Sequence, residues 1–116
     1  MSPRDQVEYL GEFEQLLLFA LLRLGENAYG VTIRQEIAHR TGRDIAAGAI
    51  YTALERLEAR GYVHSWMGEP TPERGGKRKK YYELLPAGQQ ALGRSYENLQ
   101  RMARGVARLV AEGRES

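Results

Sequence analysis

The residues best suited to chemistry lie in one short stretch of the chain. Positions 74–80, "RGGKRKK", hold five cationic side chains and no acid, whereas the remaining residues carry 12 basic and 15 acidic groups. The net charge of +2 therefore conceals one concentrated positive feature. Lysine and arginine at such density neutralise phosphates and release counterions, which gives affinity for nucleic acid. A solvated loop and a localisation tag are the other interpretations of this stretch taken alone.

Other chemistries have little support in the sequence. The chain has no cysteine, which excludes disulfides, thiolate nucleophiles and cysteine-based metal sites. His39 and His64 lie far apart and have no carboxylate cluster at metal-ligand spacing, so we expect no zinc site. The segment "RGGK" lacks the rest of a phosphate-binding loop, and no serine lies in a nucleophile motif. We therefore expect no enzyme activity, no cofactor and no metal.

Composition favours one small globular domain. The 116 residues are 42% hydrophobic and 28% charged, which is typical of a folded, soluble protein. The longest apolar run, "LLLFALL", is much shorter than the ~20 residues that a membrane helix needs. The N-terminal segment has no signal-peptide pattern, so we expect a cytoplasmic protein.

Three helices are predicted in the first half of the chain. The first, over 11–25, is apolar nearly all round, which predicts burial on more than one side and suggests contact with a second subunit. The second spans 28–42 and the third 46–61, and each ends at a glycine. The third helix has its core face at Ile50, Leu54 and Leu57. Its other face presents Gly48, Tyr51, Thr52, Glu55 and Arg56.

The second half predicts a hairpin and a last helix. Residues 62–68 and 80–85 have strand composition, so the basic stretch becomes the loop of a β-hairpin. We expect Tyr82 to be buried and Trp66 to pack on the hairpin. Pro86 opens a helix that is expected to continue without a break, with Leu92, Leu99 and Val106 seven residues apart in a heptad-like seam.

This order of elements is the winged helix-turn-helix arrangement, a mainly α fold with a small β-hairpin. We predict a DNA-binding domain over 1–85, with the wing at 62–85, and a dimerisation helix over 86–116. The third helix is expected in the DNA major groove and the wing on the backbone or minor groove. The small first turn of the third helix, from Ala46 to Ala49, would let its backbone approach phosphates.

Three segments resemble the PadR family of bacterial transcriptional regulators. They are "AYGVTIRQEI", "GAIYTALERLEARGYV" and "RGGKRKKYYELLPAGQQAL", and the resemblance runs from about Glu12 to Leu92. It implies a homodimeric repressor on a palindromic operator, with the first and last helices building the dimer. A single helix after Pro86 resembles the short subgroup of the family, and some short members bind flat, lipophilic drugs. The final helix here offers only Tyr96 for such a role, and the effector, if one exists, is unknown.

Residue roles follow from the pattern and the resemblance together. The residues expected to contact DNA are Arg34, Gly48, Tyr51, Thr52, Arg56, Arg74, Gly75, Gly76, Lys77, Arg78 and Lys79. Those expected to supply core and dimer surface are Phe13, Leu17, Leu21, Leu92, Leu99, Met102, Val106 and Leu109.

The sequence departs from the family pattern at two helix starts. Ala46 and Ala47 lie at the start of the third helix, where the family often has serine or threonine, and Asp44 is a candidate substitute cap. Leu85 precedes Pro86 where the family has threonine, so the last helix is expected to start late or to fray. The alternative from another functional class is a winged-helix module that binds protein rather than DNA.

Overall fold

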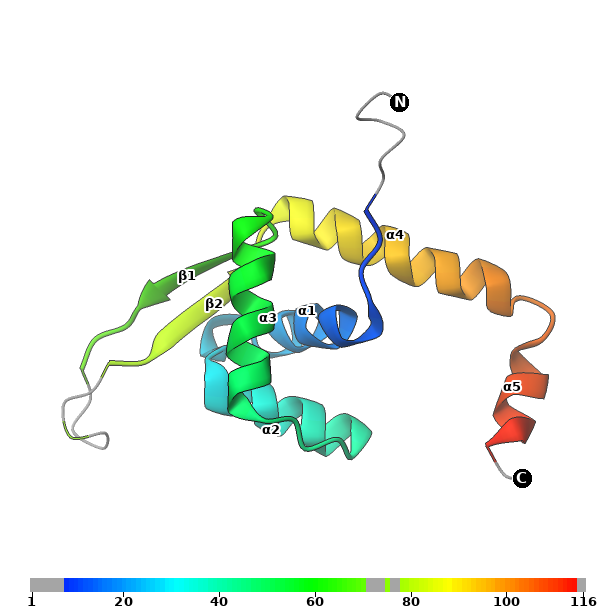
Figure 1. Ribbon diagram of the computed structural model, residues 1–116, viewed down its shortest axis with the longest axis horizontal. Helices are drawn as coiled ribbons and strands as arrows, with labels where there is room; N and C mark the ends of the chain where they lie inside the picture. The colour runs from blue at the N-terminus through cyan, green and yellow to red at the C-terminus, as the bar shows by residue number, and fades with distance from the viewer. Residues whose placement is uncertain (1–7, 71–74, 76–77, 115–116) are drawn as a thin grey trace.

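The computed structural model describes residues 8–70, 75 and 78–114. Its elements in chain order are α1 (Glu12–Leu24), the 3-10 turn η2 (Gly25–Asn27), α2 (Gly30–Thr41), α3 (Ala47–Ala59), β1 (Val63–Met67), β2 (Lys80–Leu84), α4 (Pro86–Ala103) and α5 (Ala107–Gly113). The hairpin and α4 project in opposite directions from the bundle of α1 to α3 (Figure 1). The predicted winged helix-turn-helix order is confirmed.

Helix α1 is the centre of the core. Its buried residues span more than half of the helix circumference, so the helix needs cover on more than one side; they are Gln15, Leu17, Leu18, Ala20 and Leu21. That cover comes from α2, α3, β2 and α4 of the same chain, all of which contact α1. The predicted burial on more than one side is therefore met within a single chain.

This arrangement divides the residues that were expected at a dimer surface. Leu17, Leu21 and Leu92 lie in the core of their own chain at 0%, 3% and 4% exposure, so they present no surface to a partner. Phe13 is half-buried against the same core. The exposed members of the set are Leu99, Met102, Val106 and Leu109.

The hairpin is attached to the helical core at its base. Its strands are antiparallel, with Val63 opposite Leu84 and Trp66 opposite Tyr81. The Tyr82 N–H donates to the carbonyl of Ala28 at 2.9 Å, so β2 also pairs with the connection between α1 and α2. Tyr82 is 2% exposed, as predicted, and its burial raises the pKa of the phenol to about 12.

Helix α4 begins at Pro86, so the expected late start is wrong. Leu85 provides no side-chain cap, but its backbone N–H donates to the carbonyl of Tyr62 at 2.9 Å. Gly88 lies directly against the same residue, since a Cβ on it would come within 2.2 Å of the Tyr62 carbonyl oxygen. This backbone contact fixes the start of the helix where a threonine cap is missing.

The expected single final helix is interrupted. Helix α4 ends at Ala103, Gly105 adopts φ +85°, and α5 starts at Ala107. Because only glycine takes this left-handed conformation without strain, Gly105 ends the helical path that the heptad-like spacing predicted. Figure 1 shows α5 turned away from the axis of α4.

The segment before α1 ties α4 to the rest of the chain. The N–H of Leu10 donates to the hydroxyl of Ser95 at 2.7 Å, and that hydroxyl donates to the Ala91 carbonyl at 2.9 Å. The Gln15 side chain donates to the Leu10 carbonyl at 3.0 Å. Ser95 and Gln15 are the buried polar residues of the described core, and both are satisfied by these bonds.

The carboxylate of Glu8 forms a second connection. It accepts from the Tyr62 hydroxyl at 2.8 Å and from Arg60 at 3.1 Å. These two interactions, the tyrosine bond first, lower the pKa of the Glu8 carboxyl. No helix within the described residues is long and apolar enough to cross a membrane.

Replacing Ser95 with alanine is expected to lower the free energy of unfolding by about 1–3 kcal/mol, because the buried N–H of Leu10 loses its acceptor. Urea denaturation measures this change. The control is Asn98→Ala on the exposed side of α4, where a change within about 0.5 kcal/mol is expected. Equal stabilities of the two variants would contradict the role given to the Ser95 hydroxyl.

Candidate nucleic-acid interface

Helix α3 exposes one polar face. Ile50, Leu54 and Leu57 are each 0% exposed and anchor the helix to α1, α2 and β1. The opposite side is open to solvent and carries the predicted residues Gly48, Tyr51, Thr52 and Arg56 together with Glu55. The 3.6-residue period of the helix explains this division, which matches the sequence prediction.

The first turn of α3 has no side-chain cap. Ala46 occupies the N-cap position without a side-chain hydrogen bond, and Asp44 does not substitute for it. Instead, Asp44 forms an ion pair with Arg34 of α2 at 2.9 Å. A Cβ on Gly48 would meet no atom within 4 Å, so the start of the helix faces open space. Unpaired N–H groups at a helix start favour anions.

Tyr51 lies across the start of α2. Its hydroxyl would be 2.0 Å from a Cβ on Gly30, so the tyrosine occupies the space that any larger residue would fill. Tyr51 and Arg34 line the same hollow of about 330 Å³ between α2 and α3. The importance of Gly30 was missed from the sequence, where the only signal was a glycine at a helix start in "AYGVT".

Arg78 links the two sides of the wing just beyond the paired strands, where Met67 and Gly68 face Arg78 and Lys79; we call this point the neck of the wing. Its guanidinium donates to the Gly68 carbonyl at 2.7 Å and to the Met67 carbonyl at 3.3 Å. The Gly68 N–H donates in turn to the Lys79 carbonyl at 2.7 Å. Arg78 thus has a structural role in addition to its charge, and its spacing in the sequence gave no indication of this role.

Lys79 is held over the ring of Tyr29, with its ammonium nitrogen 4.5 Å from the ring centroid. Tyr29 also forms an isolated β-bridge with Tyr81 and stacks edge-on against its ring. These contacts bring the base of the wing to the start of α2. Tyr29 is a second residue of this region that sequence reasoning missed.

The structure describes only some of the other predicted wing residues. Gly75 adopts φ +62°, whereas Arg74, Gly76 and Lys77, which were also predicted to contact DNA, lie outside the described residues. Trp66 stacks against Tyr81 at 5.9 Å between ring centroids, in agreement with its predicted packing role.

Within the described parts of the chain, no three histidine or acidic residues gather as a metal site would require.

The comparisons with known proteins agree with this geometry. The model of the Transcriptional regulator PadR-like family matches residues 18–94, which is more than half of the chain. No curated protein sequence matches the chain.

Solved structures share the fold. A PadR family transcription regulator from Clostridium difficile superimposes with a TM-score of 0.70 at 22% identity, over 86% of this chain and 99% of that one. A PadR family regulator from Eggerthella lenta gives a TM-score of 0.66 at 28% identity, over 85% of this chain and 86% of that one.

A third structure is Bacillus subtilis PadR in complex with operator DNA. Its TM-score is 0.59 at 24% identity, over 70% of this chain and 45% of that one. PadR family regulators are DNA-binding proteins without enzymatic activity. By its sequence, its winged helix-turn-helix fold and its exposed α3 face, the chain is a DNA-binding member of the PadR-like family of transcriptional regulators.

Proposed function

We propose that the protein is a homodimeric repressor that binds a palindromic operator, with α3 in the major groove and the wing on the backbone or minor groove. The observation that carries the proposal is the exposed face of α3 beside the positively charged wing. Helix α3 and strand β2 of the wing both pack on α1. A helix that exposes hydroxyl and charged groups is suited to base edges. The wing supplies affinity that does not depend on sequence.

The backbone contacts would come from the junction of α2 and α3. The Arg34–Asp44 pair is solvent-exposed, with 43% and 75% of the two side chains accessible, so it contributes little to stability. A phosphate that approaches the open start of α3 would compete with Asp44 for the Arg34 guanidinium. Arg34 would therefore change partners on binding at small cost.

The homodimer is supported by the exposed apolar side chains of α4 and α5. Met102 is 80% exposed, and Leu99 and Leu109 are 58% and 64% exposed. Solvent-exposed apolar residues concentrated on one terminal segment are typical of a protein interface. Two-fold symmetry of such a dimer would match a palindromic site.

Repression would follow from occupancy of the operator, since a bound dimer excludes other proteins from the same DNA. We place the protein in the cytoplasm, where a bacterial chromosome lies. No effector is assigned. The second candidate function is a winged-helix module that binds protein, and it is favoured only by the open apolar surface of α4 and α5.

Selection from a pool of random duplexes is expected to enrich an inverted repeat with half-site centres about 10 base pairs apart or a multiple of that. The double variant Thr52→Ala, Arg56→Ala should abolish enrichment, whereas Arg101→Ala on α4 should retain it. If a folded wild-type protein enriched no sequence, the protein-binding module would become the better assignment.

Arg78→Lys is expected to weaken binding to a matched duplex about fivefold, or ~1 kcal/mol, although the charge is kept. Lysine cannot donate to both carbonyls at the neck of the wing in the planar geometry of arginine. The dependence of the binding constant on salt should stay as in wild type. Fluorescence anisotropy across a salt series measures both quantities, and Lys80→Arg is the matched control. Wild-type affinity in Arg78→Lys would leave only a charge role for this residue.

Glu55→Gln is expected to raise affinity for unrelated duplexes and to change the base preferred at one operator position. A carboxylate in the major groove repels phosphates and accepts from cytosine N4, whereas glutamine pairs with adenine, and such a contact discriminates by about 1–3 kcal/mol. Competition between duplexes that differ at single positions measures the change. Glu97→Gln on α4 makes the same charge change away from the DNA face. If both variants gave the same base preferences as wild type, Glu55 would have no role in specificity.

A further inference from the structure

An apolar hollow opens between α1 and α2, on residues that the proposed DNA face does not use. Its volume is about 260 Å³, and it is open to solvent. Its apolar lining is Leu16, Phe19, Ala20 and Ile37. The ring of Phe19 meets that of Tyr96 of α4 edge-on, with 5.6 Å between centroids, so the hollow is continuous with the exposed side of α4.

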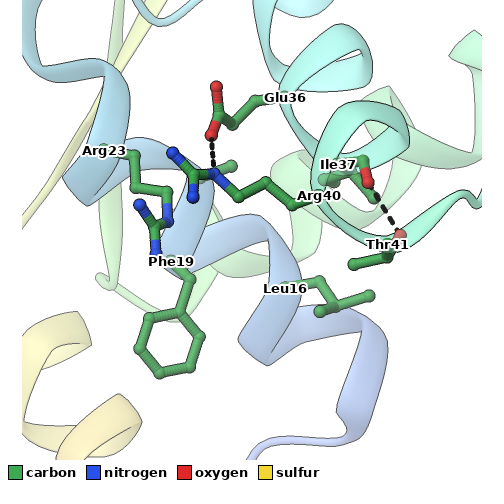
Figure 2. Close-up of a pocket in the computed structure, with 8 residues that line it drawn as sticks. Leu16, Phe19, Arg23, Glu36, Ile37, Arg40 and Thr41 are labelled. Atoms are coloured by element: carbon green, nitrogen blue, oxygen red, sulfur yellow. Dashed lines mark hydrogen bonds and ion pairs between the residues drawn. The ribbon is translucent and has the colours of Figure 1, made fainter.

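The rim of the hollow carries excess positive charge. Arg40 donates to the Glu36 carboxylate at 2.7 Å, and Figure 2 shows Arg23 beside this pair. The pKa of Glu36 is lowered, first by the hydrogen bond from Arg40, and Arg23 contributes through its charge. Two guanidinium groups face one carboxylate, which leaves one positive charge for an acid on an occupant.

Helix α5 has apolar side chains and a carboxylate that suit this hollow, and none of its residues is buried against the described parts of its own chain. It has seven residues, too few for a helix to be stable without packing. Val106, Leu109 and Val110 share one side and are 42%, 64% and 70% exposed. Glu112, three residues after Leu109, lies at the edge of that side. Its pair with Arg108, at 3.3 Å and with 92% of the arginine side chain exposed, contributes little and can be exchanged.

We propose that the hollow between α1 and α2 receives the apolar side of α5 from a second copy of the chain, with Leu109 and Val110 on its floor and Glu112 beside Arg23. The inference rests on the proposed homodimer and specifies one of its contacts. Figure 1 shows α5 beyond the far end of α4, away from α2 of the same chain. The turn at Gly105 directs α5 away from the axis of α4. In the dimer, α5 would therefore reach the hollow of the second copy, which a straight continuation of α4 would not reach.

Cross-linking tests the contact without background, because the chain has no cysteine. Leu109→Cys chains are mixed with Thr41→Cys chains, unfolded and refolded together, and treated with a short bis-maleimide. Thr41 lies on the rim of the hollow. The expected product is a covalent dimer that contains one chain of each variant. The matched control pairs Leu109→Cys with Val31→Cys, an exposed residue of α2 that lines the other hollow.

The outcomes separate the contact from the dimer itself. A monomer by light scattering would overturn the homodimer, and this contact with it. A dimer whose cross-linking does not exceed the Val31→Cys control would overturn the contact and leave the homodimer intact. Cross-linking at monomer size in a Thr41→Cys, Leu109→Cys double variant would place α5 on its own chain and would also overturn it.

Charge reversal gives an independent measurement. Glu112→Arg is expected to raise the dissociation constant of the dimer about tenfold, and adding Arg23→Glu should restore most of the loss. The coupling between the two sites in this double-mutant cycle reports the pairing directly. Additive losses in the double variant would overturn the pairing of Glu112 with Arg23.

Discussion

The burial of α1 on two sides is the constraint on which the other elements depend. A helix whose buried residues, from Gln15 to Leu21, span more than half of its circumference cannot lie at the surface of a bundle, so the other elements must surround it. Helices α2, α3 and α4 and strand β2 all contact it. Helices α3 and α4 are thus attached to the same central element, and neither is an appendage of the other.

The hairpin obtains its rigidity at the base from contacts outside the sheet. Two strands alone are marginally stable in water. Here the Tyr82 N–H pairs with the Ala28 carbonyl, and the Tyr29 ring accommodates both Tyr81 and the ammonium group of Lys79. The neck is closed by Arg78 on the carbonyls of Met67 and Gly68. Positive charge in the wing is therefore partly used to build the wing before any phosphate is present.

Periodicity and glycine positions were sufficient to predict the order of elements, the exposed face of α3 and the buried position of Tyr82. They failed where the outcome depended on contacts distant in the sequence. The heptad-like spacing through Val106 predicted a continuous helix, but one glycine with positive φ interrupts it, and spacing carries no information on backbone dihedrals. Leu17, Leu21 and Leu92 were expected to supply core and dimer surface, but periodicity cannot tell whether the packing partner of an apolar residue belongs to the same chain. The roles of Gly30, Tyr29 and Arg78 arise from contacts with residues in other elements, which a single sequence does not reveal.

The approach of Gly88 to the Tyr62 carbonyl has a mechanical consequence. Backbone lies against backbone where the hairpin begins and α4 starts, with no side chain between them to deform. Helix α4 and the hairpin should therefore rotate together as one rigid body. In a symmetric dimer, the angle at which two such helices cross would set the separation of the two wings. Any ligand or substitution that changed this angle would alter the operator spacing that the protein accepts, without touching a residue that contacts DNA.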